Sequence, residues 1–176
     1  MTIKIGINGF GRIGRMICRA ISERNDIKLV AINDPFNSGE QLAYSLKYDS
    51  VHGIFEKNVK GDDEYLYIDN KKIKLLKERN PIDLDWEKEE VDYVCECSGV
   101  FRTKDTAKNH IKPYNKKGAK KVIISAPPKD DTPMFVMGVN NEKYCKELNI
   151  VSNASCTTNC LAPLMKVLDE SFGVKE

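Results

Sequence analysis

The stretch INGFGRIGR, residues 7–15, decides the fold of this chain. Its first two residues end a short apolar run, IKIGIN (3–8), which predicts a buried parallel strand. The next segment, RMICRAISER (15–24), carries apolar residues at helical spacing, and KLVAIND (28–34) is a second apolar run. A strand, a glycine-rich turn, a helix and a second strand in this order predict one βαβ unit with parallel strands.

The remainder of the chain continues to alternate between strand and helix patterns. We expect strands at 91–97, 120–127, 134–139 and 150–155, helices at 38–48, 103–111, 141–148 and 157–172, and a hairpin at 64–77 that turns at Asp69-Asn70. Pro163 lies within the last helix, which therefore bends there or begins later. The alternation favours an α/β fold with a Rossmann-type, doubly wound, mostly parallel sheet, in which the hairpin is an insertion or an antiparallel edge.

The glycines of the opening stretch match the G-x-G-x-x-G pattern in the context that gives it meaning, between a strand and a helix. Gly9 allows a tight turn, Gly11 lets the backbone approach a pyrophosphate, and Gly14 lets the helix pack against the strand. The helix N-terminus offers free N–H groups and a positive dipole to the phosphates. We place Asn8, just before the first glycine, among the cofactor-binding candidates as well.

Asp34 supplies the second half of this fingerprint, because it lies 20 residues beyond Gly14 at the end of the second predicted strand. An acid at this place hydrogen-bonds the adenosine ribose and repels a 2′-phosphate, so the cofactor we expect is NAD rather than NADP. The alternative is a glycine turn with an incidental acid in an ordinary α/β fold.

Two other strand ends carry candidate cofactor contacts. Ser98 and Gly99 follow one predicted strand, and Ser125 falls at the end of another. Ligands of such sheets bind outside the carboxyl ends of the strands, so each of these residues can touch the cofactor. Each can equally be an ordinary turn residue.

Composition and charge narrow the class of protein. The chain has 176 residues, of which 41% are apolar and 31% charged, which predicts a folded domain, or one and a piece. No apolar run approaches the roughly 18 residues of a membrane span, and the N-terminus lacks a signal-peptide pattern, so we expect a cytoplasmic protein without a membrane partner. A net charge of +2 does not indicate nucleic-acid binding, and we interpret the basic cluster at 112–121 as a solvated turn.

The six cysteines do not predict a metal site. No C-x-x-C pair occurs, and His52 and His110 lie far from any cysteine pair in the sequence. A chain of this length without a secretion signal keeps its cysteines reduced.

Cys156 is the candidate nucleophile. It follows a predicted strand and precedes a helix, where the helix dipole and nearby N–H groups stabilise a thiolate. Ser155 and Thr157 flank it with hydroxyls that can hold an anion, and its own N–H can stabilise an oxyanion. The alternative is a small buried residue, which is also our interpretation of Cys160.

A thiol beside NAD can add to an aldehyde to form a thiohemiacetal, whose hydride passes to the nicotinamide. The resulting thioester is open to attack by water or phosphate. This chemistry needs a general base. His52 lies in a loop and His110 ends a predicted helix, and neither is placed by the sequence to reach Cys156.

Five motifs resemble those of the phosphorylating glyceraldehyde-3-phosphate dehydrogenases of glycolysis. They are INGFGRIGR (7–15), NDPF (33–36), YDSVHG (48–53), SGVF (98–101) and SNASCTTNCLAP (152–163). The resemblance runs over essentially the whole chain, and the cysteine motif is highly specific. It implies an NAD-binding Rossmann domain (1–151) and the start of a catalytic domain (152–176), in a protein that assembles as a homotetramer.

The resemblance also implies roles for individual residues around the cofactor. By this likeness Arg12 and Ile13 contact the pyrophosphate, and Asp34 contacts the adenosine ribose. Arg79 lies beside the adenine, and Ser125 lies near the nicotinamide half.

In the catalytic segment, the resemblance makes Cys156 the acylated nucleophile, and Ser155 and Thr157 ligands of phosphate groups. The implied reaction converts D-glyceraldehyde 3-phosphate, NAD and inorganic phosphate to 1,3-bisphosphoglycerate and NADH.

The sequence departs from the family pattern after the cysteine motif. The family's catalytic histidine, its phosphate-binding arginine and its last helix belong to a segment that this sequence does not include. We therefore expect the chain to be the N-terminal half of a longer enzyme, inactive alone, and we keep open a second fragment that carries the missing histidine. The alternatives are erythrose-4-phosphate dehydrogenase, a sister enzyme with the same cysteine chemistry, and a non-catalytic NAD-binding fragment.

Overall fold

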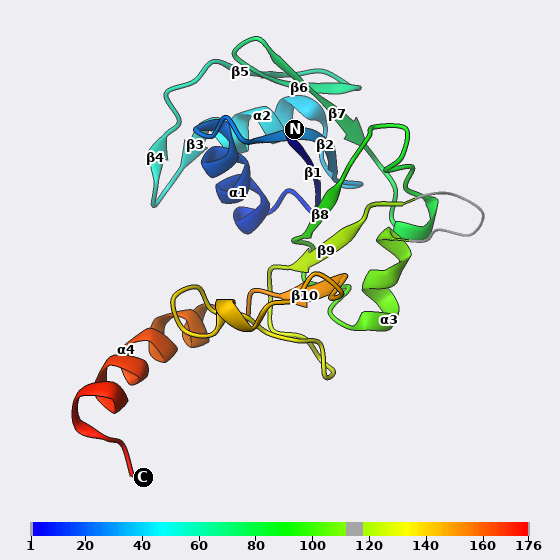
Figure 1. Ribbon diagram of the computed structural model, residues 1–176. Helices are drawn as coiled ribbons and strands as arrows, with labels where there is room; N and C mark the ends of the chain where they lie inside the picture. Colours follow the sequence, from blue (N-terminus) through cyan, green and yellow to red (C-terminus); the bar gives the residue numbers. More distant parts are fainter. Residues whose placement is uncertain (1, 112–117, 176) are drawn as a thin grey trace.

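The computed structural model describes residues 2–111 and 118–175. Its centre is an eight-stranded sheet in the order β10-β9-β8-β1-β2-β7-β6-β5, as Figure 1 shows, and a separate two-stranded hairpin is formed by β3 and β4. The strands are β1 (Ile3–Asn8), β2 (Ile27–Asn33), β3 (Tyr48–Asp49), β4 (Gly53–Ile54), β5 (Val59–Gly61), β6 (Tyr65–Ile68), β7 (Lys71–Leu76), β8 (Tyr93–Glu96), β9 (Lys121–Ile124) and β10 (Ile150–Ser152). The predicted Rossmann-type α/β fold is confirmed.

Helices flank the sheet and extend from one end of it. They are α1 (Arg12–Ser22), α2 (Gly39–Lys47), α3 (Lys104–Ala107) and α4 (Cys156–Phe172), with short 3-10 turns at Pro81–Asp83, Lys108–His110 and Asn141–Lys143. Helix α4 projects away from the sheet and none of its residues is buried (Figure 1). Among the described residues, no helix is long and apolar enough to cross a membrane.

The order of the strands creates the crevice in which ligands of this fold bind. Strand β1 lies beside both β2 and β8, and all three are parallel. The chain first builds outward from β1 through β2 and later returns to build the other side through β8, β9 and β10. The order reverses between β1 and β8, so the carboxyl ends of these two strands border the switch-point crevice.

Two apolar layers cover the two faces of the sheet. On the face of α1 and α2, the buried side chains include Ile7, Phe10, Ile32, Leu46 and Leu66. On the opposite face they include Leu84, Trp86, Val94, Ala107, Val122 and Ile124. A side chain at Gly6 would place its Cβ 2.9 Å from the Trp86 ring, so β1 has a glycine where the indole lies against it.

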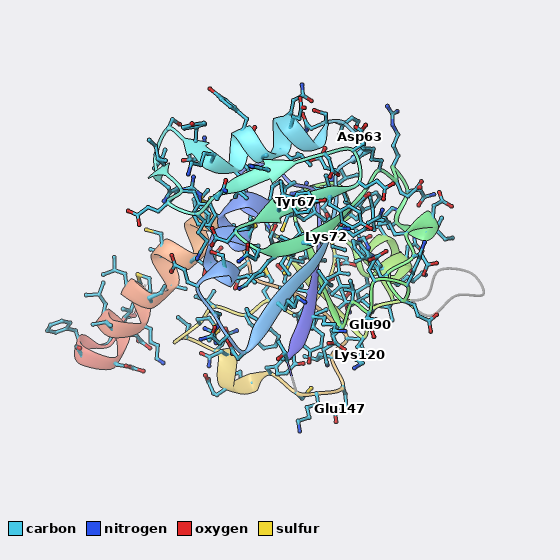
Figure 2. All side chains as sticks on the ribbon, turned by 90° about the horizontal axis from the view of Figure 1, so that it is seen from above. Asp63, Tyr67, Lys72, Glu90, Lys120 and Glu147 are labelled. Atoms are coloured by element: carbon cyan, nitrogen blue, oxygen red, sulfur yellow. The ribbon has the colours of Figure 1, made fainter. Side chains whose placement is uncertain are left out.

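The predicted hairpin is confirmed, and with β5 outside it the hairpin forms the antiparallel end of the sheet. Strands β6 and β7 pair with Tyr67 opposite Lys72, and Figure 2 shows both side chains at this end. Asp69 turns the chain with a φ of 52°, in the left-handed region that aspartate tolerates. Strand β7 also pairs in parallel with β2, which joins the hairpin to the rest of the sheet.

The predicted strand at 134–139 is wrong. Only Met134 forms a bridge, with Ser152 of β10, and the chain then turns. The Val136 N–H donates to the Asn140 side chain at 2.8 Å, and Gly138 has a φ of 80°. The asparagine side chain therefore replaces a ladder partner, as short polar side chains do in turns.

Two helix predictions also need correction. Residues 141–148 form only the 3-10 turn Asn141–Lys143, because none of its residues is buried and a short helix without a buried face is marginal. Helix α4 begins at Cys156, so the later start that we considered for the last helix is wrong, and Pro163 lies inside it. The basic cluster predicted at 112–121 falls largely outside the described residues.

The central strand β2 supplies the test of this packing. Ile32 is fully buried, so replacing it with alanine is expected to lower the free energy of unfolding by about 2–5 kcal/mol. Ile54 is exposed, and Ile54→Ala is expected to change it by about 0.5 kcal/mol or less. Urea denaturation measures both. Equal losses in the two variants would contradict this arrangement of the core.

Candidate functional site

A cleft of about 420 Å³ opens at the carboxyl ends of β1, β2, β7 and β8. It brings together six of the predicted cofactor residues, namely Asn8, Gly9, Gly11, Asp34, Arg79 and Ser98. Its other lining residues are Phe10, Asn33, Pro35, Phe36, Glu78, Cys97, Val100 and Phe101. The predicted residues Arg12, Ile13, Gly14, Gly99 and Ser125 do not line it.

The glycines of the cleft hold three backbone segments in close contact. Gly9 has a φ of 88°, and a Cβ there would lie 2.6 Å from the backbone of Ser98. A Cβ on Gly14 would lie 2.3 Å from the carbonyl oxygen of Gly9. A Cβ on Gly11 would meet nothing within 4 Å, so its backbone faces open space. The roles assigned to Gly9 and Gly14 from the sequence are therefore explained by their contacts.

The N-terminus of α1 is left open toward a ligand. Gly11 caps the helix without a side-chain hydrogen bond, and the first turn contains no acidic residue. The backbone N–H groups of Arg12 and Ile13 belong to the first turn of a helix, where the α-helical pattern supplies no partner. This site suits an anion such as a pyrophosphate, so Arg12 and Ile13 fit it through their backbone, although their side chains lie outside the cleft.

The side chain of Arg12 turns away from the cleft to Asp49. Its Nη1 lies 2.9 Å from Oδ2 and 3.1 Å from Oδ1 of this aspartate. The N–H groups of His52 and Val51, followed by the charge of Arg12, hold the pKa of Asp49 at about 2. The carboxylate therefore stays ionised across the neutral range and fixes the loop after β3 next to the helix.

Asp34 organises the loop that carries it. Its Oδ1 accepts hydrogen bonds from the N–H groups of Phe36 and Asn37 at 3.1 and 3.2 Å, and from Asn37 Nδ2 at 3.0 Å. Its Oδ2 accepts from the Phe10 N–H at 3.2 Å. The carboxylate thus lies at the end of β2 beside the glycine turn, where the fingerprint predicts it.

Phe36 and Arg79 lie against each other on one side of the cleft, and of the two only Arg79 was predicted from the sequence. The Arg79 guanidinium lies 5.4 Å from the centre of the Phe36 ring, and both residues are exposed on the cleft. A flat π-system can pack against such a pair. Phe36 is missing from the predicted residues, although an exposed aromatic directly after an acidic strand end is a signal for it.

Ser98 lies in the cleft and also makes the contacts of a turn residue. It lines the cleft, and its hydroxyl also closes the turn by accepting from the Val100 N–H at 3.1 Å and donating to Glu96. Gly99 has a φ of 75°, which the turn requires. Ser125 joins the same turn from β9, since its N–H donates to the Glu96 carbonyl at 3.0 Å. Gly99 and Ser125 therefore support the cleft from outside its lining.

Cys156 is the first residue of α4 and is exposed. The helix cap is Ser155, whose hydroxyl accepts from the Thr158 N–H at 2.9 Å and lies 3.0 Å from the Thr157 hydroxyl. The turn before it is held by Ala154, which has a φ of 59°. Cys156 thus lies at a helix N-terminus between two hydroxyl-bearing residues, as the sequence predicts. Cys160 is exposed here, so the packing that we expected for it is not made within this chain.

Three other thiols are unsuited to nucleophilic chemistry. Burial raises the pKa of Cys18 to about 12, that of Cys95 to about 11 and that of Cys97 to about 12. At neutral pH these groups are protonated, and the thiolate is the reactive form. This leaves the exposed cysteines, of which Cys156 alone begins a long helix.

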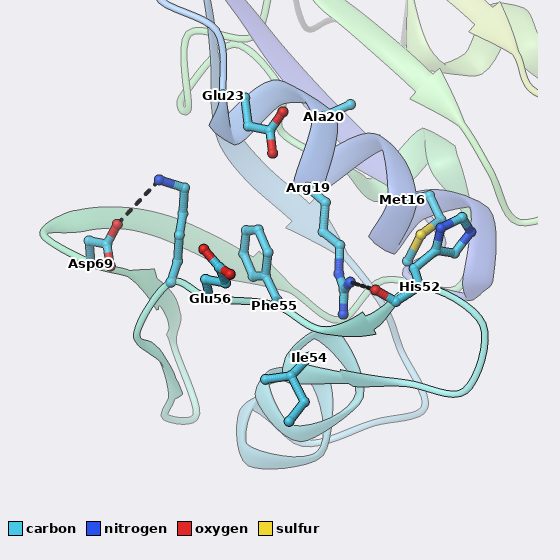
Figure 3. A pocket seen from close by; sticks show the side chains of 10 residues that line it. Met16, Arg19, Ala20, Glu23, His52, Ile54, Phe55, Glu56 and Asp69 are labelled. Atoms are coloured by element: carbon cyan, nitrogen blue, oxygen red, sulfur yellow. Dashed lines mark hydrogen bonds and ion pairs between the residues drawn. The ribbon is translucent and has the colours of Figure 1, made fainter.

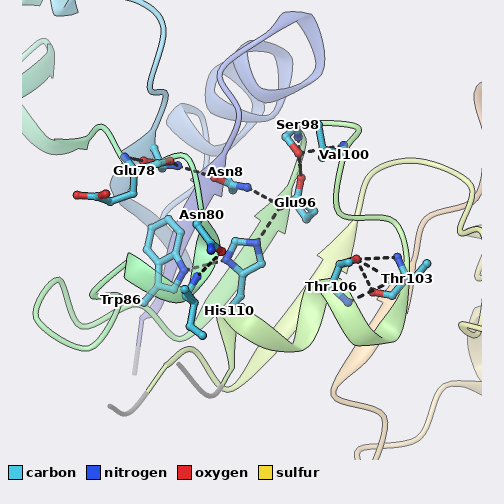
Figure 4. A network of polar contacts seen from close by, with 12 residues as sticks. Asn8, Glu78, Asn80, Trp86, Glu96, Ser98, Val100, Thr103, Thr106 and His110 are labelled. Carbon is cyan, nitrogen blue, oxygen red and sulfur yellow. Dashed lines mark hydrogen bonds and ion pairs between the residues drawn. The ribbon is translucent and has the colours of Figure 1, made fainter. Parts of the chain in front are cut away.

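Neither histidine is placed as a base for Cys156. His110 is fully buried, with Nδ1 accepting from the Trp86 indole N–H at 3.0 Å and Nε2 2.8 Å from Glu96 (Figure 4). His52 lines a groove of about 750 Å³ on the outer side of α1, where Figure 3 shows Arg19 reaching its carbonyl. Acids and bases mix in this larger groove and no strand of the parallel sheet ends there, so the cleft at the strand ends is the better candidate. In the described part of the chain, no cluster of three metal-binding side chains occurs.

Comparison with protein families agrees with this geometry. Residues 3–104 match the family described as "Glyceraldehyde 3-phosphate dehydrogenase, NAD binding domain". Residues 155–176 match "Glyceraldehyde 3-phosphate dehydrogenase, C-terminal domain". The first match includes the glycine turn and Asp34, and the second begins at the cap of the cysteine helix.

Curated relatives resemble the whole of this chain. It is 54% identical to glyceraldehyde-3-phosphate dehydrogenase of Debaryomyces hansenii and 53% identical to that of Ogataea parapolymorpha. It is also 53% identical to glyceraldehyde-3-phosphate dehydrogenase A of Escherichia coli strain K12. Each match covers 100% of this chain and 51% of the relative, so the chain spans about half the length of the curated relatives it matches.

Two glycine substitutions test the construction of the cleft. Gly14→Ala forces a methyl group against the Gly9 carbonyl and is expected to lower the free energy of unfolding by about 1–3 kcal/mol. Gly11→Ala enters open space and is expected to cost less than about 1 kcal/mol. Urea titrations of both variants decide this. A Gly11 variant that loses as much stability as the Gly14 variant would show that the turn is built differently.

Proposed function

Because the chain belongs to the glyceraldehyde-3-phosphate dehydrogenase family, we propose that it binds NAD in the cleft and supplies Cys156 as the nucleophile for oxidation of D-glyceraldehyde 3-phosphate to 1,3-bisphosphoglycerate. The observation that carries the cofactor assignment is the open N-terminus of α1, which meets the glycine turn and Asp34 at the end of β2. These are the three parts of a dinucleotide site.

The residues of the cleft fit the parts of NAD. The N–H groups of Arg12 and Ile13 are available to the pyrophosphate. The Asp34 carboxylate is available to the adenosine ribose hydroxyls, and Arg79 with Phe36 offers a flat surface for adenine. When bound, NAD would supply the hydride acceptor, and loss of a hydride to it would oxidise the aldehyde.

The thiolate of Cys156 attacks the aldehyde carbon and forms a carbon–sulfur bond. Loss of hydride from this adduct leaves an acyl thioester, and inorganic phosphate then attacks the acyl carbon and releases the thiolate. Ser155 and Thr157, the neighbours of Cys156 in the chain, have their hydroxyls 3.0 Å apart and are proposed to bind phosphate groups. Neither histidine is placed to take the thiol proton, because His110 is bound to Glu96 and Trp86 and His52 lines the groove beside α1.

The assembly that we propose is the homotetramer implied by the resemblance, with residues 152–176 as the start of its catalytic domain. Helix α4 supports this proposal, because a large exposed apolar surface usually marks a place where another part of a protein binds. Its exposed apolar side chains are Leu161, Leu164, Val167, Leu168 and Phe172. A cytoplasmic location also stays a prediction. The second candidate function is NAD binding without turnover, which the positions of the two histidines favour for these 176 residues by themselves.

Calorimetric titration of the chain with NAD tests the cofactor assignment. One site is expected, with NADP binding at least about tenfold more weakly because of Asp34. Asp34→Ala is expected to weaken NAD binding by about tenfold. The matched variant Asp63→Ala, which changes an exposed carboxylate on the far hairpin, is expected to bind as the wild type does. Absence of heat with the wild-type chain would refute the assignment.

Production of NADH from D-glyceraldehyde 3-phosphate, NAD and phosphate tests the role of the missing base. The 176-residue chain is expected to give no more NADH than its Cys156→Ser variant, because neither histidine is placed at the thiol. The absorbance of NADH provides the measurement. Full turnover by the chain alone would contradict the proposed need for a base from elsewhere.

A further inference from the structure

A line of hydrogen bonds runs along the carboxyl ends of four neighbouring strands, beneath the cleft. At the end of β8, Glu96 Oε2 accepts from Asn8 Nδ2 of β1 at 2.6 Å. Asn8 Oδ1 accepts from Asn33 Nδ2 of β2 at 2.7 Å. Asn33 in turn binds both backbone groups of Glu78, just beyond β7, at 2.8 and 2.9 Å. Figure 4 shows Asn8, Glu78 and Glu96 in this line.

Glu96 ends this line with its carboxyl group and is only 1% exposed. Its four hydrogen-bond partners are neutral donors: Asn8 Nδ2, His110 Nε2, the Ser98 N–H and the Ser98 hydroxyl. A buried carboxylate is costly unless it is fully hydrogen-bonded. Because the Glu96 oxygens accept all of these hydrogen bonds, each neighbouring side chain must turn its donor group toward Glu96.

His110 is fixed from the opposite side. The Trp86 indole N–H can only donate, so His110 Nδ1 must accept, and the neutral ring carries its hydrogen on Nε2, toward Glu96. Trp86 and His110 are both fully buried. The histidine is therefore held as a donor to Glu96 by the packing of the second apolar layer.

The consequence reaches the lining of the cleft. Because Glu96 accepts, Asn8 must present Nδ2 to it and Oδ1 to Asn33. Asn33 can then hydrogen-bond the backbone of Glu78, the residue before Arg79. Glu96 also accepts from the Ser98 N–H and so stabilises the turn after β8. Asn8, Asn33, Glu78 and Ser98 all line the cleft, and Glu96 and His110 do not.

We propose that Glu96 is a positioning residue for the dinucleotide, acting through Asn8, Asn33 and the Ser98 turn, with His110 as its supporting donor. The proposal rests on the proposed binding of NAD in the cleft. It assigns cofactor affinity to two buried residues that do not line the cofactor's cleft.

The test compares Glu96→Gln with Glu90→Gln in the 176-residue chain by calorimetry with NAD. In either orientation the NH2 group of the glutamine in Glu96→Gln faces a donor: Asn8 Nδ2 and His110 Nε2 on one side, or the Ser98 N–H on the other. NAD is therefore expected to bind about tenfold more weakly or worse. Glu90 is an exposed glutamate paired with Lys4 at the opposite end of the sheet, and its variant is expected to bind as the wild type does. Thermal unfolding monitors the folding of each protein.

AMP is the second probe, because it fills only the adenosine side of the cleft. Glu96→Leu removes both acceptor oxygens, so the line through Asn33 to Glu78 predicts that this variant also weakens AMP binding severalfold. Weaker NAD binding with unchanged AMP binding would overturn the action through Asn33.

A pair of histidine variants tests the positioning role of Glu96 even if Glu96→Gln does not fold. His110→Gln keeps a donor for Glu96 and an acceptor for Trp86, and its NAD affinity is expected to stay near that of the wild type. His110→Leu removes both and is expected to lose about tenfold. Equal NAD affinity in all folded variants and the wild type overturns this proposal alone, whereas a wild-type chain that does not bind NAD overturns the proposed function on which it rests.

Discussion

The close contact of the Gly9 backbone with Ser98 on one side and with Gly14 on the other is the constraint on which the site depends. There is no room for a Cβ at either Gly9 or Gly14, so the end of β1, the turn after β8 and the first turn of α1 meet without side chains between them. This contact leaves the N-terminus of α1 facing the cleft. It also brings the Asp34 carboxylate within hydrogen-bond distance of the Phe10 N–H.

Beneath this backbone contact, the carboxyl ends of the strands carry a layer of buried polar side chains. Most of the sheet is held by two apolar layers, but its carboxyl edge carries Asn8, Asn33 and Glu96 as buried polar residues. Such groups are stable only as a fully bonded network. The network ties the ends of four strands together at the place where the cofactor is proposed to bind. The same residues thus serve the stability of the edge and the shape of the cleft.

The sequence predicted correctly those elements that are determined by residues close together in the chain. The βαβ unit, the hairpin turning at Asp69 and the helix opening at Cys156 each follow from residues close together in the chain. The turn at 134–139 did not follow, because its apolar residues look like a strand and the Asn140 side chain decides otherwise. The Glu96 network did not follow either, since Asn8 and Glu96, which bond directly, are 88 positions apart and their pairing depends on the strand order.

We propose that NAD binds at the carboxyl ends of the strands and not in the larger groove beside α1. A titration of the ¹⁵N-labelled chain with NAD, followed by amide NMR signals, distinguishes the two places. We expect the signals of Gly11, Arg12 and Ile13 to move together with a single affinity, while those of His52 and Phe55 in the groove stay in place. Movement at His52 and Phe55 without movement at Gly11, Arg12 and Ile13 would contradict it.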